Sequence, residues 1–197
     1  MRRPDQALYS LLRRLFRAET GMAAVEFALI LPILITIWIG GVEVTQGLSV
    51  DRRLNNLASA IGDLVSRSKA INYAGVDAIF DIDEGALFPF STTGLSMRVT
   101  AVNVDADQKA LVRWSRAKGT TVRPDNENLN SLIDIKLRVA NTQIIMAEVF
   151  YTYSPAVGYV ITGDVALDDR IYFTPRRVQY LPLCDNNGAN CKGPPAA

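Results

Sequence analysis

The stretch ETGMAAVEFALILPILITIWIGGVEV, residues 19–44, decides the organisation of this chain. It holds 23 residues from Met22 to Val44, almost all of them apolar. At roughly 1.5 Å of rise per residue, a helix of that length covers about 34 Å, which is enough to cross the roughly 30 Å hydrocarbon layer of a bilayer. The stretch therefore predicts a membrane-spanning helix over residues 22–44.

Two carboxylates, Glu26 and Glu43, interrupt the apolar run, one near each end. A charged side chain inside a spanning helix costs several kcal/mol unless it finds a partner. Glu43 fits a residue that leaves the membrane at the far interface. Glu26 has apolar residues on both sides, so it needs either a partner on a neighbouring helix or a shallow position from which it reaches the headgroups.

The residues around Glu26 carry a family resemblance. Gly21 followed by MAAVEF is similar to the cleavage region of type IV prepilins of the Tad (tight adherence) type. The run from Gly21 onward, with Pro32 inside it, resembles the start of TadE/TadG-like pilus assembly proteins. The resemblance implies a processing site at which a prepilin peptidase cuts between Gly21 and Met22, and it gives Glu26, Phe27 and Pro32 roles in recognition and helix packing. In that arrangement Glu26 pairs with the α-amino group that cleavage creates on a neighbouring subunit.

Two later segments extend the resemblance. EVFYTYSP, residues 148–155, looks like the Tyr-x-Tyr-x-Pro segment of TadE-like proteins, and YFTPR, residues 172–176, is similar to their C-terminal segment. A strand whose tyrosines alternate and whose proline stops it explains the first segment equally well.

Charge is unevenly placed along the chain. The whole sequence has a net charge of +1, but residues 1–21 hold five arginines against two carboxylates, which leaves a net of −2 for the rest. An arginine-rich flank beside a first span stays in the cytoplasm, so we expect the C-terminal part to be periplasmic. Leucines at helical spacing between those arginines predict an amphipathic leader that contacts membrane lipid. The small net charge gives no reason to expect nucleic-acid binding.

The two cysteines, Cys184 and Cys191, enclose a turn-rich loop. In an oxidising compartment this spacing predicts a disulfide, with two free thiols as the alternative. A metal site is less favoured, because the chain has no histidine and no further cysteine.

We expect an α+β fold in which a long N-terminal helix, membrane-spanning in its first half, packs on a small antiparallel β-sheet head, as in pilins. Beyond the span, apolar residues continue at helical spacing from Leu54 to Val65, which extends the helix to about Lys69. The expected divisions are a cytoplasmic leader (1–21), a transmembrane helix (22–44), a periplasmic extension of the helix (45–70) and a periplasmic α+β domain (71–197).

Weaker patterns predict the elements of the head. Residues 133–140 fit a strand or a helical turn equally well, and the acidic residues 81–85 favour a solvated turn over a calcium loop. The other expected elements are a short helix (71–80), a hairpin with one wet face (95–101 and 110–115), a long connection (119–132) and three strands (143–153, 157–161 and 171–173).

Motifs of catalysis are missing from the sequence. It has no nucleophile elbow, Walker loop, dinucleotide fingerprint or histidine, and the acid pairs Asp105/Asp107 and Asp168/Asp169 are typical of hydrated surface. We therefore predict a protein that is not an enzyme and has no cofactor.

The resemblance implies a minor pilin-like (pseudopilin) or assembly subunit of a Tad-type pilus, which acts in surface attachment. It would be a single-pass protein of the bacterial inner membrane that enters a surface pilus. Its partners would be other pilin-like subunits, the inner-membrane assembly platform with its motor, and a prepilin peptidase. One alternative is an uncleaved envelope protein whose periplasmic head binds a partner or ligand, and another is an anchored hydrolase with acidic residues in a cleft.

Overall fold

The structure is a computed structural model that describes residues 20–81, 83–155, 158, 162–188 and 190–192. It divides into two compact units. The smaller unit consists of Met1–Thr45 and Ala156–Thr162, and the larger unit consists of Gln46–Pro155 and Gly163–Ala197. The elements in chain order are α2 (Thr20–Ser66), β1 (Ile71–Asn72), α3 (Tyr73–Phe80), α4 (Asp83–Leu87), β2 (Ser96–Val104), β3 (Ala110–Lys118), the 3-10 helix η1 (Ile135–Leu137), β4 (Thr142–Tyr153), β5 (Val165–Phe173), β6 (Leu183–Cys184) and β7 (Cys191–Lys192).

The long helix predicted from the sequence is confirmed as α2, which is continuous through Pro32. The hydroxyls of Thr36 and Thr45 donate to the carbonyls of Pro32 and Gly41, at 2.9 and 2.7 Å. Each hydroxyl is thereby satisfied by the backbone of its own helix, as a polar group in apolar surroundings requires.

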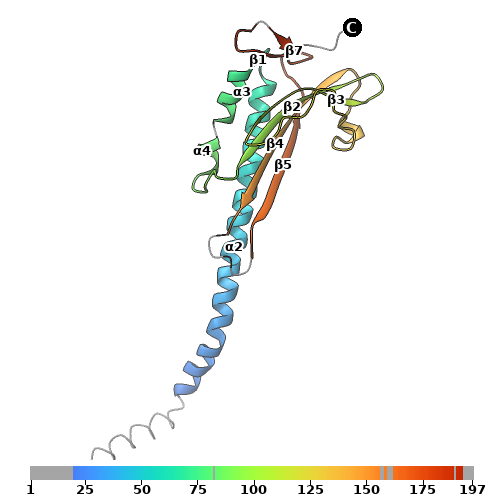
Figure 1. The fold of residues 1–197 in the computed structure, drawn as a ribbon. Coiled ribbons are helices and arrows are strands. Elements are labelled where there is room, and N and C mark those ends of the chain that lie inside the picture. The colour runs from blue at the N-terminus through green and yellow to red at the C-terminus, as the bar shows by residue number, and fades with distance from the viewer. Residues whose placement is uncertain (1–19, 82, 156–157, 159–161, 189, 193–197) are drawn as a thin grey trace, which may run out of the picture. The chain divides into compact units, whose positions relative to one another are not determined.

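The larger unit contains a four-stranded antiparallel sheet with strand order β3-β2-β4-β5 (Figure 1). The predicted hairpin is formed by β2 and β3, and the strongest predicted strand is the central β4. The expected α+β fold class is therefore confirmed.

One face of the sheet is covered by the part of α2 that follows Thr45, together with α3. Because this stretch of α2 has apolar residues at helical spacing, it presents a single buried stripe to the strands. Gly62 is buried beside that stripe, and a Cβ there would collide with the ring of Phe173 on β5. The stripe consists of Val50, Leu54, Leu57, Ala58, Ile61 and Val65.

The expectation that the hairpin has one wet face is wrong. The connection between β3 and β4 returns across that face, and Leu129 and Ile133 are buried on it beside Val102 and Met146. The Leu129 N–H donates to the Ala110 carbonyl at 2.9 Å, which holds the returning chain against the hairpin. The sheet is therefore covered on both faces.

A distant strand pairing changes the start of the predicted helix 71–80. Residues Ile71 and Asn72 form β1, which pairs in parallel with β6, so the helix begins at Tyr73. The Asn72 side chain accepts from the Gly75 N–H at 2.8 Å, which caps the helix.

Other predicted elements also differ from the structure. The acidic segment expected to be a turn contains the short helix α4, and the ambiguous residues 133–140 contain only the 3-10 helix η1. β5 is nine residues long, although only its last three were predicted as a strand. The predicted leader helix lies outside the described residues, and so does the strand expected at 157–161 apart from Gly158, which is in neither a helix nor a strand.

The end of α2 is fixed by the chain that follows β5. The carbonyl of Ser66 accepts from the Arg176 N–H at 2.8 Å, and the Arg176 guanidinium pairs with Asp63 at 2.8 Å. An otherwise unsatisfied carbonyl at the helix terminus thus has a partner.

Candidate functional site

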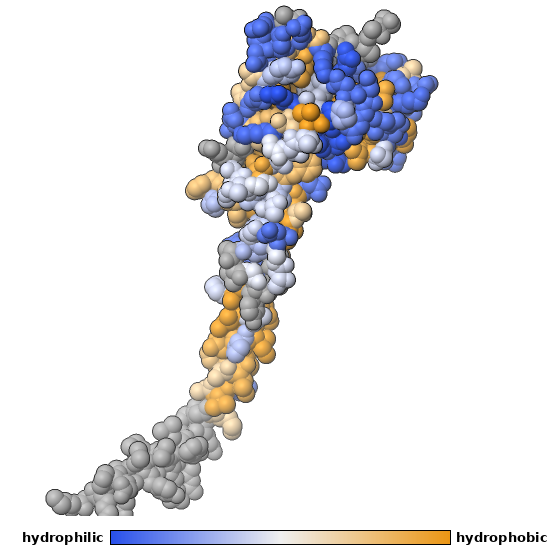
Figure 2. Space-filling model, in the orientation of Figure 1, coloured by the Kyte–Doolittle hydropathy of each residue, from blue (hydrophilic) through white to orange (hydrophobic). Residues whose placement is uncertain are grey.

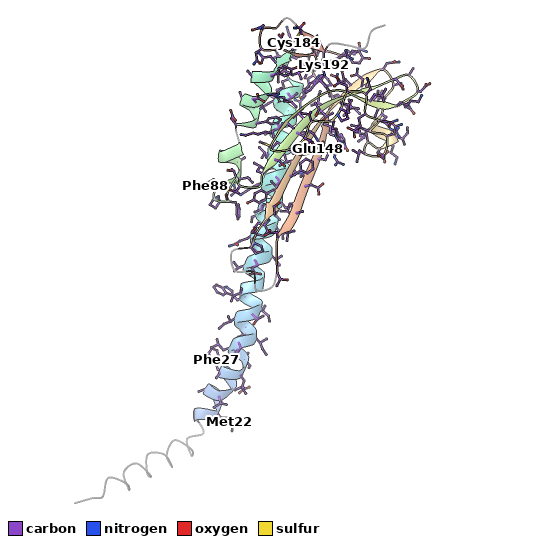
Figure 3. All side chains as sticks on the ribbon, in the orientation of Figure 1. Met22, Phe27, Phe88, Glu148, Cys184 and Lys192 are labelled. Atoms are coloured by element: carbon purple, nitrogen blue, oxygen red, sulfur yellow. A yellow bond between two sulfur atoms is a disulfide. The ribbon has the colours of Figure 1, made fainter. Side chains whose placement is uncertain are left out.

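The first part of α2 presents a continuous apolar surface. Met22, Phe27 and Trp38 are 73%, 59% and 71% exposed, and the most apolar stretch of the helix has no buried residue. Figure 2 colours most of this surface as hydrophobic, with a few hydrophilic residues among the apolar ones, and Figure 3 labels Met22 and Phe27 on it. By length and composition the helix is a candidate membrane span.

The two carboxylates of the apolar run differ in exposure. Glu26 is exposed among apolar side chains, whereas Glu43 is almost completely buried (1% exposed). Glu43 also has an interaction partner. Of these two acids, Glu26 is therefore the one that is exposed on the apolar surface of the helix.

The residues of the predicted processing site lie in the first turns of α2. Gly21 and Met22 are both helical, and Phe27 and Pro32 follow on the same helix. One helix thus carries all the residues that the sequence assigned to processing, recognition and packing.

The sheet contains a charged cluster that the sequence analysis did not identify. Register places Arg98 on β2 and Arg170 on β5 directly opposite Glu148 on β4, and Arg123 reaches the same carboxylate from the connection after β3. The distances from the guanidinium nitrogens of Arg98, Arg123 and Arg170 to the Glu148 oxygens are 2.7, 3.0 and 3.0 Å. Figure 3 labels Glu148 at this position in the sheet.

The three arginines determine the ionisation of Glu148, whose side chain has no exposed surface. Burial alone would raise its pKa, but hydrogen bonds from Arg98 and Arg123 outweigh burial and hold the pKa below its usual value. The carboxylate therefore ties two strands and the covering connection together. The available sequence signal was a glutamate at an inward-facing position of the strongest strand.

A second ion pair attaches α3 to the sheet. Arg116 on β3 binds both carboxylate oxygens of Asp77, at 3.0 and 2.6 Å, and lies over the ring of Tyr73. The hydrogen bond from Arg116 lowers the pKa of Asp77. Because both side chains are partly exposed, this pair contributes less stability than the buried cluster.

The predicted disulfide is present and joins Cys184 to Cys191. It closes the β6–β7 hairpin, which is tied to the rest of the unit at two further points. The Ala74 N–H donates to the Asn186 side chain at 2.9 Å, and Lys192 pairs with Asp125 at 2.6 Å. Figure 3 labels Cys184 and Lys192 in this hairpin.

Acidic residues do not assemble a metal site in the described part of the chain. No group of three or more histidine, cysteine or acidic side chains there is placed to hold an ion. Asp105 and Asp107 lie in the β2–β3 turn, where Asp105 accepts from the Lys109 N–H at 2.8 Å. Asp168 and Asp169 lie on β5.

Comparison with known proteins identifies the segment that contains the predicted processing site. Residues 21–62 match the family model described as TadE-like protein. No curated protein matches the chain, and no solved structure matches it. Residues 21–62 are therefore similar to TadE-like proteins, and this segment covers both the exposed apolar part of α2 and most of its buried stripe.

Proposed function

We propose that this TadE-like chain is a minor pilin-like or assembly subunit of a Tad-type pilus, anchored in the bacterial inner membrane by the first part of α2. The observation that carries the proposal is the matched helix itself. Its exposed apolar part suits contact with lipid and with other helices, and its later part forms the core of an α+β unit. The role is structural and involves no reaction.

Orientation follows from the charge of the leader. Five arginines precede the apolar run, and such a flank remains cytoplasmic, which places the sheet-containing unit in the periplasm. The disulfide supports this location, because a periplasm is oxidising and favours the bond.

Cleavage between Gly21 and Met22 by a prepilin peptidase would give Glu26 its partner. The cut creates an α-amino group at Met22, and a neighbouring subunit could bring such a group to the exposed carboxylate of Glu26. Two opposite charges in lipid-like surroundings strongly favour pairing, because each is costly alone. Phe27 and Pro32 would shape the same helix–helix contact.

The further partners in this proposal are other pilin-like subunits and the inner-membrane assembly platform with its motor. Their association depends on helix packing, since lipid tails give little hydrophobic drive between helices and polar pairs then contribute to specificity. In a surface pilus the subunit would contribute to attachment.

The test of the packing role is Glu26→Ala in the full chain, with Asp51→Ala as the control. Asp51 is an exposed carboxylate later on the same helix. We expect Glu26→Ala to remain membrane-inserted and to co-purify less with pilin-like subunits, while Asp51→Ala co-purifies normally. Unchanged co-purification of Glu26→Ala would count against the packing role.

A further inference from the structure

A groove at the end of the β2–β3 hairpin is formed by residues to which the proposed function gives no role. It has a volume of about 220 Å³. Its apolar lining residues are Val104, Ala106, Leu111 and Val112. The polar lining residues are Asn103, Asp105, Arg113, Asn126, Asn141 and Tyr180.

Three irregularities of the backbone bring the polar side chains together. The register between β2 and β3 shifts just after Ala101 and leaves Arg113 as the bulged residue of β3. Asn126 and Asn141 have φ angles of 64° and 59°, in the left-handed region that, apart from glycine, asparagine is among the residues most able to adopt. Bulges re-aim side chains, and residues held in uncommon backbone conformations cluster at binding sites. All three irregular residues line the same groove.

Backbone hydrogen bonds fix the two left-handed residues and leave their side chains available. The Asn126 N–H donates to the Val112 carbonyl at 2.8 Å, and the Asn141 carbonyl accepts from the Tyr180 hydroxyl at 3.0 Å. Within the described residues, the side-chain amides of Asn126 and Asn141 have no hydrogen-bond partner in the protein. Each amide can therefore offer a donor and an acceptor to a ligand.

A buried relay orients a third amide. Gln143, which is 2% exposed, accepts from the Leu181 N–H at 2.6 Å and donates to the Asn103 side-chain oxygen at 2.9 Å. Because that oxygen is occupied, Asn103 has its amide N–H groups to offer. Asp105 also lines the groove, and one of its carboxylate oxygens accepts from the Lys109 N–H at 2.8 Å, so this carboxylate adds acceptors. The groove thus combines the held side chains of Asn103 and Asp105 with the exposed amides of Asn126 and Asn141.

We propose that this groove binds a monosaccharide or a single terminal sugar residue. A sugar hydroxyl both donates and accepts, so neighbouring hydroxyls match a lining of amides and a carboxylate. Leu111, which is half-buried, offers an apolar contact that suits the C–H face of a sugar ring. The volume is below the roughly 300–1,000 Å³ of pockets for drug-sized ligands, which limits the occupant to about one ring. This proposal goes beyond the pilus role and does not depend on leader cleavage.

The experiment uses the full chain in phosphatidylcholine nanodiscs, because glycoside detergents would compete for the groove. Glucose, galactose, mannose, N-acetylglucosamine and glucuronate are titrated by saturation-transfer NMR, with glycylglycine as a peptide comparator. The test variant is Asn126→Gly/Asn141→Gly, since glycine tolerates positive φ and only the two amides are lost. The matched control is Asn187→Gly, an exposed asparagine outside the groove.

At least one sugar should bind saturably, and its affinity should fall about tenfold or more in the double variant, because two amides that hydrogen-bond the ligand are removed. Asn187→Gly should bind as the natural chain does. Three results would overturn the proposal: no sugar binds, the double variant binds equally well, or only glycylglycine binds.

Discussion

Replacing Glu148 by glutamine should be among the most destabilising conservative changes in the sheet-containing unit. The change keeps the size of the side chain and removes its charge, which leaves the guanidinium groups of Arg98, Arg123 and Arg170 facing a neutral amide. Arg98 and Arg123 are each only 12% exposed and cannot rehydrate without moving the connection, whereas Arg170, at 28%, can turn outward.

The size of the effect follows from that burial. Breaking a buried ion pair by removing one partner costs about 3–5 kcal/mol, and we expect the lower part of this range because Arg170 can reach water. For a chain of 150–250 residues, about 3 kcal/mol corresponds to a fall in Tm of roughly 6–12 °C. Such a loss is a large part of the roughly 5–15 kcal/mol that stabilises a typical domain.

The assay is thermal and denaturant unfolding of the full chain in non-denaturing micelles, with Glu127→Gln as the matched control. Glu127 also pairs with Arg123, at 3.1 Å, but its side chain is 33% exposed, so its loss should cost less than about 1 kcal/mol. If Glu148→Gln unfolds within about 1 kcal/mol of the natural chain, as an exposed pair would, the argument that this carboxylate holds the connection to the sheet is refuted.

Three further predictions concern acid, packing and the disulfide. Folding lowers the pKa of Glu148, so the stability that this carboxylate contributes should be fully present at pH values above its ordinary pKa of 4.5 and should decline as the pH falls below that value. When Tm is measured as a function of pH, Glu148→Gln should therefore show a shallower decline in acid than the natural chain. Gly62→Ala should be destabilising despite the better helix propensity of alanine, because the new methyl group meets the ring of Phe173. The control Gly47→Ala, whose new Cβ has its nearest contact at 3.7 Å, should be neutral or stabilising by about 1 kcal/mol. Equal unfolding midpoints for the two variants would contradict this prediction. Cys184→Ser should lower the free energy of unfolding by about 2–3 kcal/mol and expose the C-terminal hairpin to protease while α2 stays protected. Cleavage that begins within α2 would contradict this prediction.

The features predicted correctly from the sequence are those with local causes. The apolar run and the stripe from Leu54 to Val65 specify α2 by periodicity within one segment, and β4 is rich in β-branched and aromatic residues. The cysteine pair encloses a short turn-rich loop, so its disulfide also follows from nearby residues.

The features that were missed depend on contacts between distant segments. Most of β5 was not predicted as a strand because it contains Asp168, Asp169 and Arg170. Charged residues break the alternation that marks a strand, but they are tolerated at the edge of a sheet, where β5 lies. β1 exists only because Leu183 and Cys184 pair with it from the far end of the sequence. The Glu148 cluster requires the register of three strands, which no local pattern contains.

The most direct test of the proposed pilin-like role is the intact mass of the membrane-extracted protein from cells with and without an active prepilin peptidase. We predict a peptidase-dependent loss of residues 1–21, which leaves Met22 as the new N-terminus and gives Glu26 an amine partner on a neighbouring subunit. A full-length mass in both strains would contradict processing at Gly21 and would favour an uncleaved envelope protein whose function lies in its folded head.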